Sequence, residues 1–446
     1  MKLPRLALRL LPILGVAFFA LPCAQAWGPM HHAITEAAFD SLPAWQRELL
    51  AGQRQTLIEF DCMIPDLARA AANKKTIGRF VILPNGDLFT HEPHSREHNY
   101  AQMLHYFTKA VESVRANELD EASRYAGCLL HFLEDCGSPA HSMPGDNQHG
   151  FMQDLIPVPD EYKNRPLHGL IENGTLQLDL AGYRPQLLGT TPEEAVMHLT
   201  ERLHAAIRNA RAQVIPILQG VFRKDDAAID AGRRRAATMN AQVAADALYS
   251  ILAVAKSRFE PDEKARLDTV DVAALTPLEV INQSYFPQFS YFSNPYFGFP
   301  VRNAILEDGA TKRPLALHIV ENGATKAQTF ERGLGLGSGC RVTYAIPLKT
   351  YERFECLVGA HATLGGTAAL SFRIFADGEA VFESGILTGE SPAQKVSIPV
   401  WRVREISIET QNRSTSPTPP KNYAVIAAPT LLKAPAPPKF DQDKTR

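Results

Sequence analysis

The spacing of apolar and polar residues changes near residue 260 of this chain of 446 residues. Before that point, apolar residues recur at helical spacing. One such stretch opens at Thr191-Pro-Glu-Glu194, a capping box with proline at the first helical position, and continues through Leu199, Leu203, Ile207 and Ala210. Residues 236–259 form an alanine-rich helical stretch, and the apolar run 125–130 predicts a buried helix. The first half is therefore expected to be helical.

After residue 260 the helical pattern fades and short alternating runs replace it. The runs predict strands over residues 341–346, 369–375, 395–400 and 405–409. Asp377-Gly378 fits a two-residue hairpin turn between strands. The predicted fold class is a multidomain chain, in which an all-α helical domain is followed by an all-β sandwich.

The amino terminus has the pattern of a secretory signal. Basic residues come first, the apolar run Leu10–Leu21 follows, and Ala24-Gln-Ala26 supplies a small-x-small cleavage site. A lipoprotein signal at Cys23 fits less well, because Ala20 and Pro22 precede it. We expect a mature chain that starts at Trp27 and is secreted or periplasmic. The predicted domains are a signal peptide (1–26), a helical domain (27–260), a linker (261–289), a sandwich (290–432) and a disordered tail (433–446).

Charge and cysteine content narrow the function classes. With 46 basic and 48 acidic residues, the chain has no strong electrostatic case for a stable nucleic-acid partner or an anionic membrane. Removal of Cys23 with the signal leaves five cysteines, an odd number. Cys128 and Cys136 lie around one predicted helix and are too far apart to pair if it is intact. A disulfide scaffold is therefore not expected.

The histidines gather in the helical half, where ten of the fourteen fall between His31 and His168. The most informative stretch runs from His131 to His141. His131 and Asp135 are four residues apart and share one helix face, while Gly137 and Pro139 end the helix so that His141 can return beside them. Burying an imidazole and a carboxylate without a partner is costly, and a metal ion is the simplest partner.

The candidate ligands come in a recognisable order along the chain. They lie in Trp27-Gly-Pro-Met-His-His32, Met63-Ile-Pro-Asp66, Thr90-His-Glu-Pro-His94, the stretch from His131 to His141, and His168-Gly-Leu-Ile-Glu172. Over residues 27–258 this order resembles the secreted trinuclear-zinc phosphodiesterases, the zinc-dependent phospholipases C and the P1/S1 nucleases. Imidazole and carboxylate are ligands that zinc prefers, which agrees with the resemblance.

The resemblance implies about three zinc ions with shared ligands. The first zinc would take Asp66, His91, His131 and Asp135; the second the amine and carbonyl of Trp27, His32 and the other oxygen of Asp135; the third His141, His168 and Glu172. It also implies that Asp66 acts as a general base. Three alternatives stay open: His31 in place of His32, His94 or His98 in place of His91, and His149 in place of His168.

The second half resembles another family. Gly333-Leu-Gly-Leu-Gly-Ser338, Phe354–Ala360, Phe372–Gly378 and Ser384–Gly389 look like the NPCBM-type carbohydrate-binding β-sandwich. The resemblance implies a sandwich fold and a possible carbohydrate ligand. A sandwich that only packs on the catalytic domain is the alternative.

Together these features predict a secreted zinc-dependent phosphoric ester hydrolase, phospholipase C-like, that acts on a phospholipid or another phosphodiester. One alternative is a single-strand-specific nuclease, which would need aromatic side chains to stack on bases. Another is a non-catalytic carbohydrate-binding protein in which zinc is structural.

Overall fold

The computed structural model describes residues 28–70, 73–91, 96–142, 157–163, 167–172, 174, 176–282, 300–307, 311–415 and 420–433. Several predictions fall outside these residues: the signal peptide, the ligand role of Trp27, the alternatives His94 and His149, and the disordered tail beyond residue 433. Of Glu172 only the backbone belongs to the described part.

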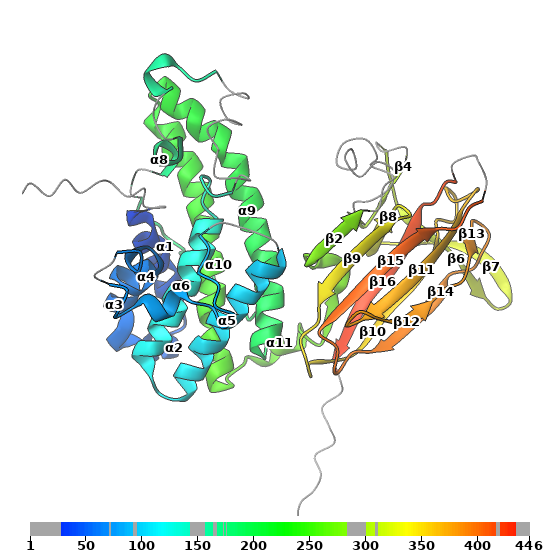
Figure 1. Cartoon of the computed structure of the whole chain (residues 1–446), viewed down its shortest axis with the longest axis horizontal. Helices are drawn as coiled ribbons and strands as arrows, with labels where there is room; N and C mark the ends of the chain where they lie inside the picture. Colours follow the sequence, from blue (N-terminus) through cyan, green and yellow to red (C-terminus); the bar gives the residue numbers. More distant parts are fainter. Residues whose placement is uncertain are drawn as a thin grey trace, which may run out of the picture.

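A helical domain and a sheet domain lie side by side, in the order that the sequence predicted (Figure 1). The α-helices are α1 (Pro29–Asp40), α2 (Ala44–Leu49), α3 (Arg54–Glu59), α4 (Ile64–Leu67), α5 (Arg96–Arg115), α6 (Leu119–Cys136), α8 (Leu167–Glu172), α9 (Pro192–Arg223), α10 (Asp226–Lys256) and α11 (Pro261–Ala265). Short 3-10 turns include η2 (Asp61–Met63) and η3 (Gly78–Val81).

The long helices begin and end where local chemistry dictates. In α9, the backbone N–H of Glu194 donates to Thr191 Oγ1 at 3.2 Å, which confirms the predicted capping box. Asp225 caps α10 by accepting from the N–H of Ala228 at 3.0 Å. Helix α6 is buried from Ala126 to Cys136 and lies in the centre of the domain core, and Gly137 ends it as predicted.

The sheet domain is a sandwich of two antiparallel sheets, in the order β14-β10-β16-β8-β3 and β12-β11-β15-β9-β2, with β1 paired to β16 and β13 paired to β11. The strands are β1 (Thr269–Asp271), β2 (Glu279–Asn282), β3 (Val301–Arg302), β4 (Ile305–Glu307), β5 (Thr311–Arg313), β6 (Leu315–Glu321), β7 (Ala324–Phe330), β8 (Gly333–Leu336), β9 (Cys340–Ala345), β10 (Tyr351–Ala360), β11 (Ala369–Ala376), β12 (Glu379–Glu383), β13 (Leu387–Thr388), β14 (Gln394–Pro399), β15 (Glu405–Asn412) and β16 (Ala424–Lys433).

The sandwich begins earlier than the sequence suggested. Strand β1 pairs with β16 and strand β2 pairs with β9, so residues 269–271 and 279–282 belong to the two sheets. The linker predicted over 261–289 is therefore part of the sandwich in these places, because its short strands complete the sheet ladders. The predicted hairpin turn is present, and both Asp377 (φ 48°) and Gly378 (φ 83°) adopt the positive φ that such turns require.

A buried polar contact joins the two domains at the start of α9. The side chain of Glu194 is fully buried, and it accepts hydrogen bonds from Tyr351 Oη at 2.7 Å and from the Thr190 backbone N–H at 2.7 Å. Lys433 Nζ lies 2.9 Å from the same carboxylate. One turn further on, Met197 packs into the core of the sandwich. We call Glu194, Tyr351 and Lys433 the interdomain triad.

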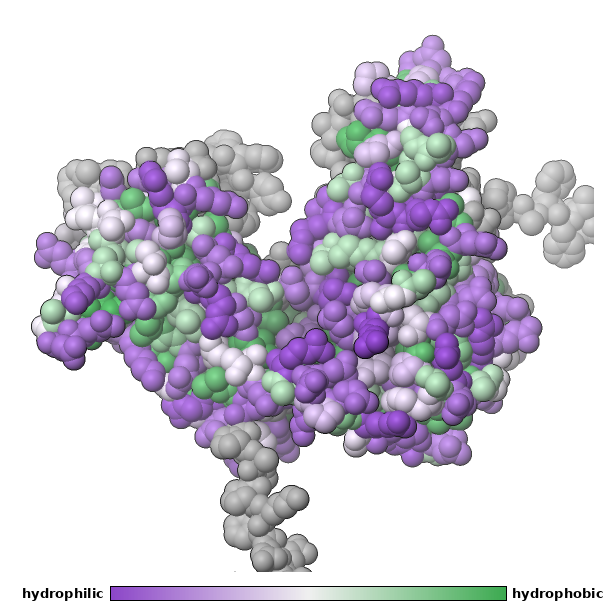
Figure 2. All heavy atoms as spheres, turned by 180° about the vertical axis from the view of Figure 1, so that it is seen from behind, coloured by the Kyte–Doolittle hydropathy of each residue, from purple (hydrophilic) through white to green (hydrophobic). Residues whose placement is uncertain are grey.

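The outer surface is mainly hydrophilic on the face shown in Figure 2, with apolar side chains scattered between. Among the described helices, none is long and apolar enough to cross a membrane. The five cysteines that follow the predicted signal are all buried, and none of them forms a disulfide.

Candidate metal centre

Helix α6 supplies the middle of the site. His131 and Asp135 project from one face of it and are both fully buried. His131 Nδ1 lies 2.6 Å from the carbonyl oxygen of Cys62, so this nitrogen carries a hydrogen and Nε2 points toward Asp135. Gly127 allows this contact, because a side chain there would lie 2.4 Å from the backbone of Asp61, next to Cys62. The close approach of η2 to α6 thus fixes the orientation of His131.

Four predicted ligands of the first zinc come together. His131 Nε2 lies 3.2 Å from His91 Nδ1 and 3.2 Å from Asp135 Oδ2, and His91 Nδ1 lies 2.9 Å from the same oxygen. Asp66 Oδ1 lies 3.8 Å from His91 Nδ1 and 3.9 Å from His131 Nε2. Asp66 comes from α4, and His91 lies 25 residues further along the chain, after η3 and the Ile82–Leu88 bridge. The structure thus brings His91 to this group; His98 lies on α5.

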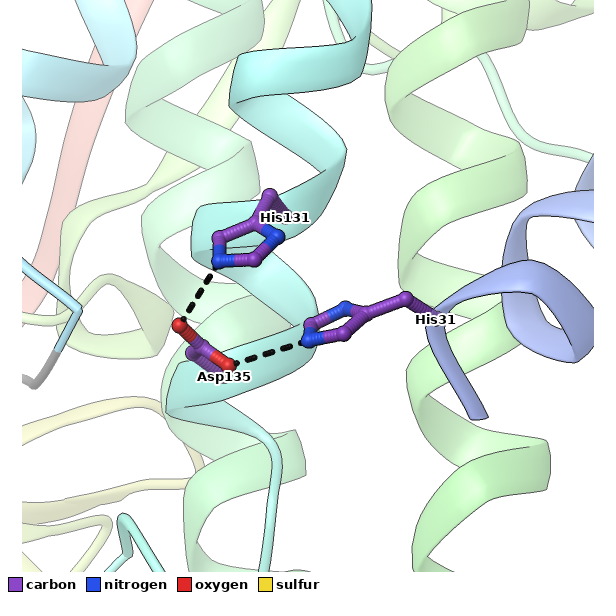
Figure 3. A group of neighbouring side chains, drawn as sticks. All are labelled: His31, His131 and Asp135. Carbon is purple, nitrogen blue, oxygen red and sulfur yellow. Dashed lines mark ion pairs between the residues drawn. The ribbon is translucent and has the colours of Figure 1, made fainter. Parts of the chain in front are cut away.

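The second group contains His31 and not the predicted His32. His31 Nε2 lies 3.3 Å from Asp135 Oδ1, and the His31 and His131 rings stack with centroids 4.2 Å apart. Figure 3 shows His31 reaching from α1 toward one oxygen of Asp135, while His131, on α6, faces the other oxygen. Asp135 therefore lies beside the stacked pair of histidines and presents one oxygen to each.

His32 lies on another side of α1. Its Nδ1 is 2.6 Å from the carbonyl oxygen of Ile58, and its side chain lines a separate cavity together with Glu36 and Asp40. Successive residues on a helix point about 100° apart, so only one of the two neighbouring histidines can face Asp135. The structure thus favours the alternative that the sequence left open, His31 in place of His32.

Two further residues hold His31 in place, and sequence reasoning missed both roles. Glu134 Oε2 lies 2.6 Å from His31 Nδ1, and Thr35 donates to Glu134 Oε1 at 2.8 Å. A carboxylate on the far nitrogen of a histidine fixes its tautomer and directs the other nitrogen toward a metal. The available signal was that His31 and Thr35 are four residues apart and so share one face of α1.

The predicted third group is only partly described. The rings of His141 and His168 lie edge to face with centroids 4.7 Å apart, and His141 Nε2 is 4.0 Å from Asp135 Oδ1. The turn after α6 thus brings His141 back beside Asp135, as expected. Glu172 ends α8, the helix that also carries His168.

The electrostatics centre on an ionised carboxylate. Burial alone would raise the pKa of Asp135, but the charges of His131 and His141 and hydrogen bonds from His131 and His31 hold it well below its usual range. Burial lowers the pKa of His31 most, yet its hydrogen bonds and charge interactions with Asp135 and Glu134 outweigh burial and raise it well above 6.5. Burial lowers the pKa of His91. Asp135 is thus a buried anion surrounded by imidazoles, an arrangement that favours a cation.

These donors fit zinc on geometric grounds. Ligands about 2.0–2.1 Å from a tetrahedral zinc lie about 3.3 Å apart, close to the 3.2 Å that separates His91 Nδ1 from His131 Nε2. Asp66 Oδ2 is buried and has no hydrogen-bond partner among the described residues. Two triads have ligand atoms within 4.8 Å of one another: His31, His131 and Asp135, and Asp66, His91 and His131. His131 belongs to both triads. Asp135, from the first, also lies 2.9 Å from His91 Nδ1 of the second.

Comparison with known proteins identifies the second domain. Residues 300–431 match the NPCBM/NEW2 domain, and the sandwich is thus of the NPCBM type, as the sequence predicted. A CBM51 from Clostridium perfringens, solved in complex with methyl-galactose, is 21% identical and covers 37% of this chain and 99% of its own length, with a TM-score of 0.30. No curated protein matches the chain in sequence.

Two solved structures also extend over the helical domain. Alpha toxin from Clostridium absonum is 11% identical and covers 89% of this chain and 85% of its own length, with a TM-score of 0.33. Alpha-toxin from an avian strain of Clostridium perfringens is 11% identical and covers 92% and 99%, with a TM-score of 0.29. At these TM-scores the likeness carries no argument about activity, which depends on the residues of the site.

Proposed function

We propose that the helical domain is a zinc-dependent phosphodiesterase of the phospholipase C type. The observation that carries the proposal is that the ligand atoms of Asp66, His91, His131 and Asp135 lie close together, with His31 at the other oxygen of Asp135. A protein core accepts so many ionisable groups only when they are paired or coordinate a metal. Zinc, when bound, lowers the pKa of a coordinated water toward neutrality and polarises a phosphoryl oxygen.

In the proposed site, Asp135 is the shared residue. One of its oxygens faces His131 and His91, and the other faces His31 and His141, so it can bridge two metal positions. Asp66 has a buried oxygen without a hydrogen-bond partner in the described part of the chain, and the proposed role of this oxygen is to accept a proton from the attacking water. The three-zinc count and the membership of His141, His168 and Glu172 belong to the same proposal.

The amine of Trp27 is the proposed remaining ligand of the second metal position, and it becomes available only if a signal peptide ends at Ala26. Gly28, which follows Trp27, directly precedes α1 and hence His31. The proposal therefore includes export from the cytoplasm. Amino-terminal sequencing of the exported chain tests it, and any start other than Trp27 contradicts this ligand.

Metal content and substrate choice test the central proposal. The purified native chain is expected to hold about three zinc ions by elemental analysis and to cleave phosphatidylcholine and a chromogenic phosphodiester. Asp135→Asn should lose more than one zinc and nearly all activity, because it removes a bridging charge. Asp120→Asn, an exposed position on the same helix, is the matched control and should behave as native.

The alternatives give different results in the same assays. Preferential cleavage of single-stranded DNA would indicate a nuclease. Retention of zinc with no cleavage of any phosphodiester would indicate structural metal in a carbohydrate-binding protein.

For the NPCBM-type domain we propose carbohydrate binding, and the domain match is what supports it. A glycan array probed with the full chain tests this role. Absence of any saturable glycan signal would leave the sandwich with a packing role against the helical domain.

A further inference from the structure

We propose that a groove lined by residues from 65–69, 74–82 and 88–91 binds the headgroup and upper acyl region of an anionic glycerophospholipid, beside the proposed metal centre. The inference rests on the proposed phosphodiesterase function and specifies its substrate class. The groove encloses a cavity of about 710 Å³, and His91 is one of its lining residues. A molecule bound in it would thus reach one of the proposed zinc ligands.

One wall of the groove is the hairpin of residues 81–89, which hydrogen bonds and packing hold in place. The N–H of Phe89 donates to the carbonyl of Val81 at 2.9 Å, and Leu83 donates to Asp87 at 2.8 Å across the turn. Phe80, at the foot of the hairpin, is 1% exposed, and its carbonyl accepts from Tyr106 Oη at 2.7 Å. The Phe89 ring contacts the rings of His91 and His131. The base of the groove is therefore packed directly onto the metal centre.

The charge of the groove is uniformly positive. Arg69, Lys74, Lys75 and Arg79 line it, and none of its lining residues is acidic. Arg79 pairs with Glu121, but Arg69, Lys74 and Lys75 have no carboxylate within ion-pair distance in the part of the chain that the structure describes. Since the whole chain has a formal net charge of −2, this is a local concentration of positive charge that selects for an anion.

Exposed aliphatic side chains lie beside these cations. Ile82 and Leu88 are bridge partners across the hairpin and are 49% and 67% exposed, although both are large and apolar. Cationic and aliphatic side chains on one surface suit the boundary between lipid headgroups and acyl chains. A single-stranded nucleic acid would instead require exposed aromatic rings for stacking, and Phe89, the aromatic member of the lining, is 8% exposed. The observations favour the lipid.

Vesicle flotation with the full, zinc-loaded chain tests the proposal. The chain is expected to bind vesicles containing phosphatidylglycerol more tightly than vesicles of phosphatidylcholine alone, and salt should weaken this binding. The variant Arg69→Gln/Lys74→Gln/Lys75→Gln should bind the anionic vesicles roughly 100-fold more weakly, at about five-fold per cation. Ile82→Ser/Leu88→Ser should weaken binding to both kinds of vesicle.

The control carries three equivalent substitutions at exposed lysines away from the groove, Lys256→Gln, Lys264→Gln and Lys326→Gln, and should bind as native. Native-like binding by the groove variants, equal binding of the two vesicle types by the native chain, or displacement of the lipid by single-stranded DNA would each overturn the inference.

Hydrolysis of a soluble chromogenic phosphodiester separates the two proposals. If the native chain lacks it, the phosphodiesterase proposal fails. If the native chain hydrolyses the phosphodiester but binds the two kinds of vesicle equally well, the groove proposal fails and the phosphodiesterase proposal stands.

Discussion

Two neighbouring histidines at the start of α1 have different surroundings. His31 is fully buried against Asp135 and is held by Glu134, whereas His32 contacts a backbone carbonyl and lines another cavity. Both are histidines in the first turns of α1, so any difference between their substitutions reflects their positions and not their residue type. A pair of single substitutions can therefore test the site without a change of residue type.

His31→Ala is expected to remove about one zinc ion and most phosphodiester hydrolysis, because it takes one imidazole from the proposed metal centre. The loss in zinc affinity at that position should exceed the roughly 10–100-fold typical of losing a supporting residue. His32→Ala should keep its zinc content. Elemental analysis and chelator competition measure both, and the reverse order of effects would restore His32 as the ligand.

Asp61 gives a prediction for stability against pH. Burial raises its pKa from 3.8 to about 6, although Ser123 donates a hydrogen bond to it. Between about pH 4 and pH 6 the folded chain therefore keeps a proton that the unfolded chain has lost, so the free energy of unfolding falls as pH rises through this window. Asp61→Asn cannot titrate. In zinc-free protein, the free energy of unfolding of Asp61→Asn should therefore increase relative to that of the native chain from pH 4 to pH 6, because only the native chain loses this stability.

Urea unfolding at several pH values measures this difference. The unfolding free energies of the native and Asp61→Asn chains should diverge over the window and run parallel above it. Parallel curves from pH 4 upward would mean that the carboxyl titrates normally.

At the scale of elements, α6 and η2 pack so closely that no side chain fits between them at Gly127. Gly127→Ala would place a methyl group 2.4 Å from the backbone of Asp61, whose displacement would move Cys62 and with it the carbonyl that orients His131. We expect a loss of about 1–3 kcal/mol in stability, together with weaker zinc binding.

Gly52→Ala is the matched control, because a methyl group there meets nothing within 4 Å. It should change stability by less than about 0.5 kcal/mol. Thermal unfolding and zinc titration compare the two variants, and equal behaviour would show that α6 and η2 can separate at little cost.

Elements with strong local signals could be predicted from the sequence. The capping box of α9, the glycine end of α6 and the Asp377-Gly378 turn each depend on residues close in sequence. The choice between His31 and His32 could not be predicted in the same way, because it depends on how α1 rotates against α6, more than ninety residues away. Strand β1 could not be predicted, because its three residues are too few to show an alternation of apolar and polar side chains. Its partner β16 is also distant in sequence.

At the scale of the whole molecule, the interdomain triad should make the two domains unfold together. Glu194 lies in the first turn of α9, and its fully buried side chain accepts from Tyr351 and pairs with Lys433. Glu194→Ala leaves the ammonium of Lys433 without its carboxylate, which should cost about 3 kcal/mol. Calorimetry should show one transition for the native chain and two for the variant.

Glu193→Ala is the neighbouring control, since the Glu193 side chain takes no part in the triad. It should keep a single transition close to the native temperature. A single transition in Glu194→Ala as well would mean that apolar packing around Met197 alone couples the domains.

The same triad bears on how such a protein could gain or exchange its appended domain during evolution. If recombination joined a different sandwich after α11, the carboxylate of Glu194 would be buried against a surface that lacks its partners. Such a chimera would be less stable than the native chain. Compatible donors are those with a hydroxyl and an ammonium at the places of Tyr351 and Lys433. A library of sandwich swaps selected for folding should therefore be enriched in that pair.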